Sequence, residues 1–368
     1  MAEGTSQTQK LERFRCPACG ADMAFDPATG GLKCAFCGHT EAVPAPASST
    51  GLQPHPFDGA ATQHEAISPT AIQVTCDGCG TTVVFQPPEV AGVCPFCGNA
   101  LVAQPKAADP LIAPDAVLPA KVPKQAAQSE VQKWLSSRWF APNALKRLAQ
   151  QEGISGVYLP FWTYMADTRT QYSGERGEHY WDTEYYTETD DQGRVVQRSR
   201  QVQRTRWYPA AGQVFRRFDD VLVPATRAVN ESRLNALEPW DLGSLCPYEP
   251  AYLAGFKAQR YQVELKAGFE TAKNLMADPI RQDVQRDIGG DEQRVLSLAT
   301  EYANVMFEHL LLPVWIGAYR FQNKVYQVAV NARTGEVQGA RPYSVVKIVL
   351  LVAAILVAIL IIVLLARR

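Results

Sequence analysis

The stretch that decides the N-terminal part of the fold is residues 16–38, CPACGADMAFDPATGGLKCAFCG, which recurs at residues 76–98 as CDGCGTTVVFQPPEVAGVCPFCG. The two copies are separated by a constant offset of 60 residues. Each copy holds two Cys-x-x-Cys pairs with fourteen residues between them, and a phenylalanine, Phe36 or Phe96, inside its second pair. A repeat at one fixed offset predicts two copies of the same small structural unit.

The cysteine spacing is typical of a zinc ribbon. Zinc takes four thiolates at the corners of a tetrahedron, and one Cys-x-x-Cys turn supplies two of them. We therefore expect two structural Zn2+ ions, because a site closed by four thiolates leaves no position open for water or a substrate. The expected ligands are Cys16, Cys19, Cys34 and Cys37 for the first ion and Cys76, Cys79, Cys94 and Cys97 for the second.

Three functions are open for such ribbons: a module that contacts other proteins, a nucleic-acid binder, and a rubredoxin-like iron centre that carries electrons. Nucleic-acid binding needs clustered Lys and Arg to neutralise phosphates. The chain has a formal net charge of −1, and residues 70–105 contain Asp77 and Glu89 but no Lys or Arg. The charges therefore favour protein contact, while iron stays an alternative because four thiolates also bind iron.

Cysteine usage also indicates the compartment. Eight of the nine cysteines fall in Cys-x-x-Cys pairs, and residues 1–25 contain no apolar run that could serve as a signal peptide. Metal ligation needs reduced thiols, so we expect these residues to face a reducing cytosol. The ninth cysteine, Cys246, is expected to be a buried free thiol.

Composition divides the chain into ribbons, linkers, one larger domain and an anchor. We predict ribbon 1 at residues 1–45, a flexible linker at 46–69, ribbon 2 at 70–102, a Pro/Ala-rich linker at 103–123, an α+β domain at 124–344 and a transmembrane anchor at 345–368. Both linkers are rich in Ala, Pro, Ser and Gly, which favours an extended, mobile chain.

The larger domain alternates helical and strand patterns. The expected elements are a helix from Ser129 to just before Pro142, a short helix at 143–151, strands at 157–226, a long helix at 261–287 and further strands at 295–341. Helices placed between runs of antiparallel strands define the α+β class. The motifs at 159–162 (LPFW) and 312–315 (LPVW) each open a strand group, and we attribute both to tryptophans packed in the core.

Charges within 178–206 alternate with uncharged residues, so each strand carries its charges on one face. If Gly193 ends a three-residue loop in a left-handed conformation, Glu184 lies opposite Arg200 and Asp190 lies opposite Arg194. The simplest interpretation is a solvated, ion-paired face worth at most about 1 kcal/mol per pair. A charged surface for a partner is the alternative.

The apolar run 348–366, IVLLVAAILVAILIIVLLA, contains 19 consecutive apolar residues. As a helix it would rise about 28 Å, which just spans a bilayer core. Only Arg367 and Arg368 follow it, so we expect insertion after synthesis, a single pass, and the bulk of the chain on the cytoplasmic side. The lipid bilayer is therefore one expected partner.

We expect no enzyme. The five histidines form no ligand pair, and the sequence contains no phosphate-binding loop, no nucleophile elbow and no zinc-protease motif. A small-molecule substrate is accordingly not expected.

Several motifs resemble a bacterial family of double-zinc-ribbon proteins with a C-terminal membrane anchor, encoded beside phage-shock-type and flotillin-like membrane-stress proteins. The motifs are the paired ribbons, YLPFWTY at 158–164, PWDL at 239–242, LPVW at 312–315, VNARTGEV at 330–337 and RPYS at 341–344. The resemblance implies an adaptor or scaffold that recruits stress-response proteins to the cytoplasmic face of the bacterial membrane. Members are often labelled primosomal helicase-like or transcription-factor-type ribbons. Because this sequence lacks a nucleotide site, we do not expect helicase activity.

Overall fold

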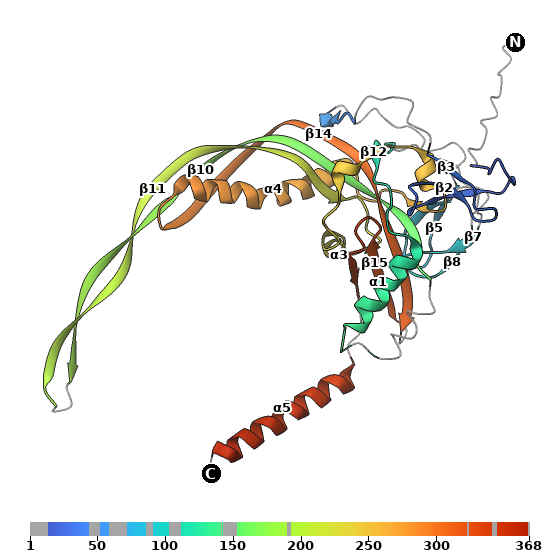
Figure 1. Ribbon diagram of the computed structural model, residues 1–368. Coiled ribbons are helices and arrows are strands. Elements are labelled where there is room, and N and C mark those ends of the chain that lie inside the picture. Colours follow the sequence, from blue (N-terminus) through green and yellow to red (C-terminus); the bar gives the residue numbers. More distant parts are fainter. Residues whose placement is uncertain are drawn as a thin grey trace.

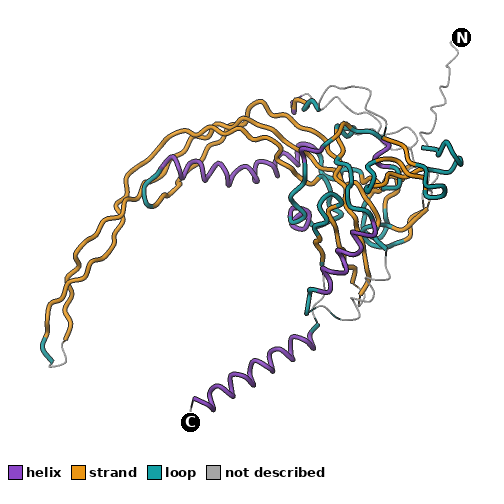
Figure 2. The backbone as a smooth tube through the Cα atoms, in the orientation of Figure 1, coloured by secondary structure: helices purple, strands orange, loops and turns teal. Residues whose placement is uncertain are grey.

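The computed structural model describes residues 14–43, 52–58, 72–85, 91–102, 112–140, 142, 153–189, 193–321, 324–340 and 344–366. A body that contains both ribbons carries a long curved sheet on one side, and a separate helix projects below it (Figures 1 and 2). The architecture confirms the expected class: two cysteine-rich units near the N-terminus, a mainly antiparallel α+β body and one apolar helix at residues 346–366.

Three long strands form the centre of the sheet. β10 (Ser155–Thr189) lies between β11 (Val195–Pro224) and β14 (Glu292–Phe321) and is antiparallel to both. β10 has 35 residues, so it is roughly 115 Å long at about 3.3 Å per residue. The antiparallel strands expected at 157–226 are thus a single hairpin. The strands can be this long because each finds a neighbour for its hydrogen-bonding groups.

Short strands join the rest of the body to this centre. β15 (Lys324–Asn331) pairs with β14 and with β16 (Val337–Gly339), and β4 (His55–Pro56) also pairs with β14. The same edge of β14 also receives β9 (Ala116–Val117), which is parallel to β14, and β12 (Cys246–Pro247) is antiparallel to β9. β13 (Lys257–Gln259) is parallel to β10. Segments that are far apart in the chain therefore meet where the first half of β10 pairs with β14.

The two LPxW motifs face each other in this centre. Leu159 of β10 lies directly opposite Leu312 of β14 in the antiparallel register. The side chains of Trp162 and Trp315 are 0% and 6% exposed, respectively. Core packing of the tryptophans is therefore confirmed.

Helix α4 (Leu265–Ile288) covers the inner face of the curved sheet (Figures 1 and 2). Its buried side chains repeat at helical spacing: Leu265, Phe269, Ala272, Met276, Ile280, Val284 and Ile288. The Tyr164 hydroxyl donates to the Leu265 carbonyl at 2.6 Å, and Trp162 Nε1 donates to the Val263 carbonyl at 2.8 Å. A Cβ at Gly268 would lie 2.9 Å from the Trp162 ring, so glycine permits this close approach.

Helix bounds differ from those expected. α1 (Lys124–Ser136) begins after Pro123, five residues before Ser129, and ends before Trp139, whose side chain is 59% exposed. Pro123 explains the earlier start, because proline fits the boundary where no N–H is needed.

α4 begins after Tyr261, which packs on Trp162 at a ring distance of 5.1 Å, and ends at Gly289 with φ 65°. The helix expected at 143–151 lies outside the described residues.

Three short helices complete this part of the body: α3 (Glu231–Asn235) and the 3-10 helices η2 (Leu242–Ser244) and η3 (Pro250–Leu253). In the turn after β15, Gly335 has φ 87°.

Neither linker is free chain throughout. In the second linker, Ala116, Val117 and Leu118 are fully buried, and the N–H groups of Lys121 and Val122 donate to the Ala332 carbonyl. The first linker contributes β4 to the central sheet. The expectation of extended, mobile chain is therefore wrong for residues 52–58 and 112–123, because strand pairing and burial of apolar side chains outweigh the Pro/Ala composition.

The hairpin tip, residues 178–189 and 193–206, extends beyond the start of β14, whose first residue lies opposite Gly177. Glu184 lies opposite Arg200 as expected, with 2.6 Å between Glu184 Oε2 and an Arg200 nitrogen. Gly193 has φ 76°, which confirms its left-handed conformation. Asp190 lies outside the described residues. Further ion pairs cross the strands: Arg198 with Glu188, and Arg204 with Asp182.

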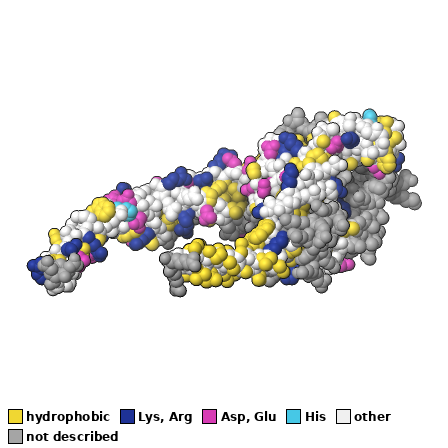
Figure 3. Space-filling model, turned by 60° about the horizontal axis from the view of Figure 1, so that its bottom comes forward, with side chains coloured by type: hydrophobic (Ala, Val, Ile, Leu, Met, Phe, Trp, Pro, Cys, Tyr) yellow, Lys and Arg dark blue, Asp and Glu magenta, His cyan; other side chains and the backbone are white. Residues whose placement is uncertain are grey.

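Helix α5 (Val345–Ala366) holds a candidate membrane span, Val346–Ala366, with 21 residues and a mean hydropathy of 3.8. None of it is buried against the protein (Figure 3). By length and composition it can cross a bilayer once, which supports a single-pass membrane protein.

Removal of most of the hairpin tip should leave the body stable. In a variant with residues 182–202 replaced by an Asn-Gly turn, we expect the Tm to change by less than about 2 °C, because exposed ion pairs on two strands contribute little. Thermal unfolding in detergent measures this. Met276→Ala is the control: its side chain is fully buried under the sheet, and its loss should cost about 2–5 kcal/mol. A drop of several degrees on shortening would contradict the prediction.

Candidate metal centres

Ribbon 1 is built on three short strands: β1 (Met23–Asp26), β2 (Gly31–Cys34) and β3 (Thr40–Ala42). All four expected ligands come together, and their sulfur atoms lie within 4.8 Å of one another. Cys16 Sγ is 3.4 Å from Cys37 Sγ, and Cys19 Sγ is 3.5 Å from Cys34 Sγ. A glycine with φ above 70° follows each Cys-x-x-Cys turn, so the backbone can close tightly.

Ribbon 2 repeats this arrangement on two hairpins: β5 (Ile72–Thr75) with β6 (Thr82–Phe85), and β7 (Ala91–Val93) with β8 (Ala100–Val102). Cys76 Sγ is 3.4 Å from Cys97 Sγ, and Cys79 Sγ is 3.7 Å from Cys94 Sγ. Zinc at about 2.3 Å from four tetrahedral sulfurs requires sulfur separations of about 3.8 Å. Both groups can therefore hold a metal ion with four protein ligands.

Each group contains one thiol whose pKa is lowered, Cys34 or Cys79, beside thiols whose pKa is raised. In ribbon 1 the N–H groups of Cys37 and Phe36 bond to Cys34 Sγ and lower the pKa of this thiol to about 6. In ribbon 2 burial raises the pKa of Cys94 and raises that of Cys97 to about 11. Backbone donors thus favour a thiolate at Cys34, whereas the thiols whose pKa is raised, Cys19 and Cys37 in ribbon 1 and Cys94 and Cys97 in ribbon 2, need a cation to displace their protons.

Ribbon 1 is attached to the body by its first strand. The Phe25 N–H donates to the Ala254 carbonyl at 2.9 Å, and the Phe25 ring meets that of Tyr252 edge-on at 5.4 Å. Cys16 and Cys34 share a buried cluster with Trp315 of β14. Two of the four cysteines of ribbon 1 are thus part of the packed body.

Ribbon 2 is attached more deeply. β6 pairs with β13, and the Phe96 side chain is fully buried in the cluster that contains Leu159 and Leu310. Gln327 Nε2 donates to the Phe96 carbonyl at 2.6 Å, and Lys257 Nζ donates to the Val93 carbonyl at 3.3 Å. Mobile linkers would leave the ribbons free to move, but both ribbons are held in place because they bury apolar side chains against the central strands.

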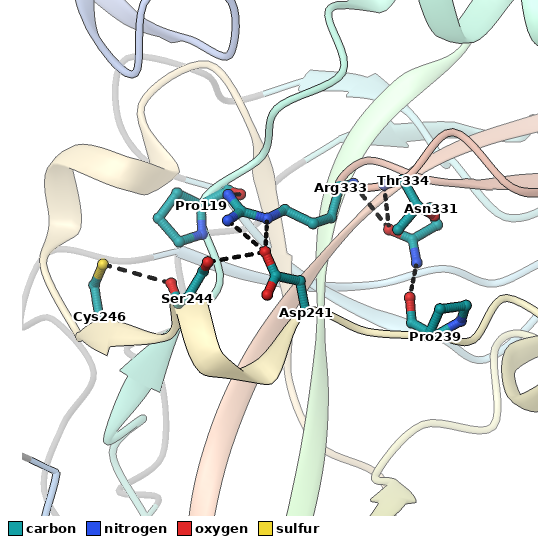
Figure 4. A network of polar contacts seen from close by, with 8 residues as sticks. All are labelled: Pro119, Pro239, Asp241, Ser244, Cys246, Asn331, Arg333 and Thr334. Carbon is teal, nitrogen blue, oxygen red and sulfur yellow. Dashed lines mark hydrogen bonds and ion pairs between the residues drawn. The ribbon is translucent and has the colours of Figure 1, made fainter.

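The motifs PWDL and VNARTGEV meet in one polar network (Figure 4). Asn331 is fully buried, and its Nδ2 donates to the Pro239 carbonyl at 3.4 Å. The Arg333 guanidinium contacts Asp241 Oδ2 at 2.7 Å and the Pro119 carbonyl at 3.2 Å. Hydrogen bonding to Arg333 lowers the pKa of the Asp241 carboxyl. These polar groups satisfy one another and backbone carbonyls, so the network joins three segments of the chain.

Sequence patterns missed a buried cluster of titratable groups, because its members are far apart in the chain. His309 lies against the Trp162 ring at 4.7 Å, and its Nδ1 donates to the Ile112 carbonyl at 2.9 Å. Burial lowers the pKa of His309, so the ring is neutral. Asp115 accepts hydrogen bonds from the His309 N–H and from His55 Nε2, both at 2.7 Å.

Glu308 is the second buried member of this cluster, and its side chain is 4% exposed. Burial, together with the carboxylates of Asp115 and Asp220, raises the pKa of Glu308 to about 7, whereas His55 acts in the opposite direction. Cys246 is half-buried rather than buried as expected, and its thiol donates to the Ser244 carbonyl at 3.7 Å.

Among known proteins, the chain is similar to "Uncharacterized protein YdjG" of Bacillus subtilis (strain 168). The two are 26% identical over 339 residues, which cover 90% of each chain. The similarity therefore extends well beyond the two ribbons. No protein-family model matches the chain. No solved structure matches it either.

Metal analysis of purified protein should give two zinc ions per chain. Cys34→Ser and Cys94→Ser should each reduce this to one, since a closed site with three thiolates binds zinc far more weakly. Cys94→Ser should also lower the Tm, because Cys94 lies in the same buried cluster as Leu159. Cys246→Ser, which removes the cysteine outside the ribbons, is the control and should keep both ions. Iron with visible absorption would contradict the zinc assignment.

The raised pKa of Glu308 predicts a pH effect on stability. Between pH 4.5, where the unfolded side chain ionises, and pH 7, the folded state keeps a proton that the unfolded state has lost. The free energy of unfolding should therefore fall over this range by at most about 3 kcal/mol. Thermal unfolding of wild type and Glu308→Gln from pH 5 to 8 measures this, and the variant should lack this part of the slope. Equal slopes would contradict the prediction.

Proposed function

We propose that the chain is a membrane-anchored, zinc-stabilised adaptor that recruits protein partners at the cytoplasmic face of the membrane and has no catalytic activity of its own. The main support is the combination of two closed four-thiol groups with an apolar helix that can cross a bilayer. A four-thiolate site stabilises a fold and leaves no position for a reacting molecule. α5 would keep the body next to the lipid.

The polar groups support a binding role rather than catalysis. The polar network around Asn331 and Arg333 holds segments of the body together. His309 and Asp115 are likewise bonded to backbone groups. These contacts use the polar groups for structure, which is consistent with a scaffold.

The shape also supports this proposal. The outer parts of β10, β11 and β14, with α4 beneath them, project from the body as a curved arm (Figures 1 and 2). The hairpin tip carries exposed aromatic rings, with Trp181 and Tyr185 each 67% exposed. Exposed Trp and Tyr on a rigid strand are favourable anchors for protein contact.

The finer part of this proposal comes from the family resemblance. It implies a bacterial cytoplasmic membrane, an envelope-stress response, and partners of the phage-shock or flotillin-like type. The ribbons are fixed in the body, so they would act as rigid contact surfaces for such partners.

Affinity purification from gently solubilised membranes tests the adaptor role. The full-length chain should copurify a defined set of proteins, and Cys16→Ser with Cys34→Ser should lose some of them. Cys246→Ser is the matched control, since it removes a thiol outside the ribbons. Mass spectrometry identifies the partners. Unchanged partners after loss of the ribbon thiols would refute the ribbon role, and the absence of any specific protein would refute the adaptor.

A further inference from the structure

The two ribbons place the same residue in opposite environments. Phe36 and Phe96 occupy equivalent positions between the last two cysteines of each repeat. The Phe96 side chain is fully buried, whereas that of Phe36 is 85% exposed. An isolated exposed apolar residue is common on protein surfaces. Phe36 differs from such residues because Phe96, its counterpart in ribbon 2, shows how a turn of this kind packs against a protein surface.

In ribbon 2 the turn around Phe96 is one of the points of attachment to the body. The ring enters an apolar cluster that includes Val229 and Ala329. At the rim of this cluster, the Gln327 side-chain amide donates to the backbone carbonyl of Phe96 at 2.6 Å. The turn thus binds through one aromatic ring and one carbonyl, and its receptor is an apolar pocket with an amide donor at the edge.

Ribbon 1 uses a different surface to contact the body, so its corresponding turn is free. Its contacts run through β1, where the Phe25 N–H reaches the Ala254 carbonyl. Both cysteine turns of ribbon 1 are uncharged at their tips, and Pro17, Ala18, Ala35 and Phe36 are exposed. We name these four residues the ribbon 1 knuckle. Because β1 is fixed to the body, the knuckle is presented on a rigid support, which lowers the entropic cost of binding.

The position of the knuckle argues against lipid as its ligand. α5 begins beside α1, where the Ser344 N–H donates to the Phe140 carbonyl at 2.8 Å. In Figure 1, β2 and β3 lie well away from this point, at the end of the body opposite to the curved arm. The tips themselves carry no Lys or Arg to bind a phosphate group, and Lys33, which precedes the second turn, is paired with Asp26 at 3.5 Å.

We propose that the ribbon 1 knuckle is a protein-docking site, in which Phe36 enters an apolar pocket on a partner that has a side-chain donor at its rim for the Phe36 carbonyl. This rests on the proposed adaptor function and names the surface involved. The pocket on the partner would have the same chemistry as the site in the body that holds Phe96. Because no charge takes part, binding depends little on ionic strength.

The test begins with a photo-reactive benzoylphenylalanine at position 36 of the full-length chain in its own membrane. The protein crosslinked there is identified and produced, and its affinity is measured for wild-type chain in lipid nanodiscs. Phe36→Ala should weaken binding about 30-fold, as for a buried aromatic anchor. Phe215→Ala, which removes an aromatic ring that is 70% exposed on β11, is the matched control and should bind like wild type. Both variants should keep two metal ions and an unchanged Tm.

Salt gives an independent readout. Affinity should change by less than about twofold between 50 and 500 mM KCl, since exposed charges are screened in this range and the knuckle has none. The proposal is overturned if position 36 crosslinks only to lipid, to nucleic acid or to another copy of the chain, or if Phe36→Ala binds like wild type. Partners that copurify equally with Phe36→Ala would refute the knuckle while leaving the adaptor function intact. A chain without any partner would refute both.

Discussion

The antiparallel pairing of β10 with β14 around Leu159 and Leu312 is the contact on which the rest of the body depends. Both faces of this pair are covered. Phe161 and Leu310 belong to the cluster that receives ribbon 2, whereas Trp162 and Phe307 belong to the cluster under α4. The outer edge of β14 receives β9, β4 and β15. Loss of this pairing would remove the surface against which each of these elements packs.

This arrangement explains which features the sequence could predict. The thiol groups follow from local spacing, because a Cys-x-x-Cys turn and its glycine set their own geometry wherever they occur. The apolar helix and the facing of Glu184 and Arg200 are also local, since composition and strand period determine them. The class of fold and the grouping of each set of cysteines could be predicted for the same reason.

The attachment of the ribbons could not be predicted, because it depends on surfaces formed by distant segments. Phe36 and Phe96 stand in matching sequence, and only the folded body shows that one is a core residue. The cluster of His55, Asp115 and Glu308 is assembled from three separate parts of the chain, so no spacing reveals it. The prediction of mobile linkers was wrong for a related reason. Their composition favours mobility, but Leu118 is buried once the sheet has formed.

The ion-paired face of the hairpin tip has a consequence for a chain held at a lipid surface. In sequence, residues 178–206 contain six acids, Glu178, Asp182, Glu184, Glu188, Asp190 and Asp191, and five arginines, Arg194, Arg198, Arg200, Arg204 and Arg206. Anionic leaflets have a potential of about −30 mV and draw in segments with an excess of basic residues. A balanced strand pair experiences almost no net pull from this field. The tip can therefore stand away from the headgroups without electrostatic adhesion, and its reach is set by the stiffness of the sheet rather than by the lipid composition.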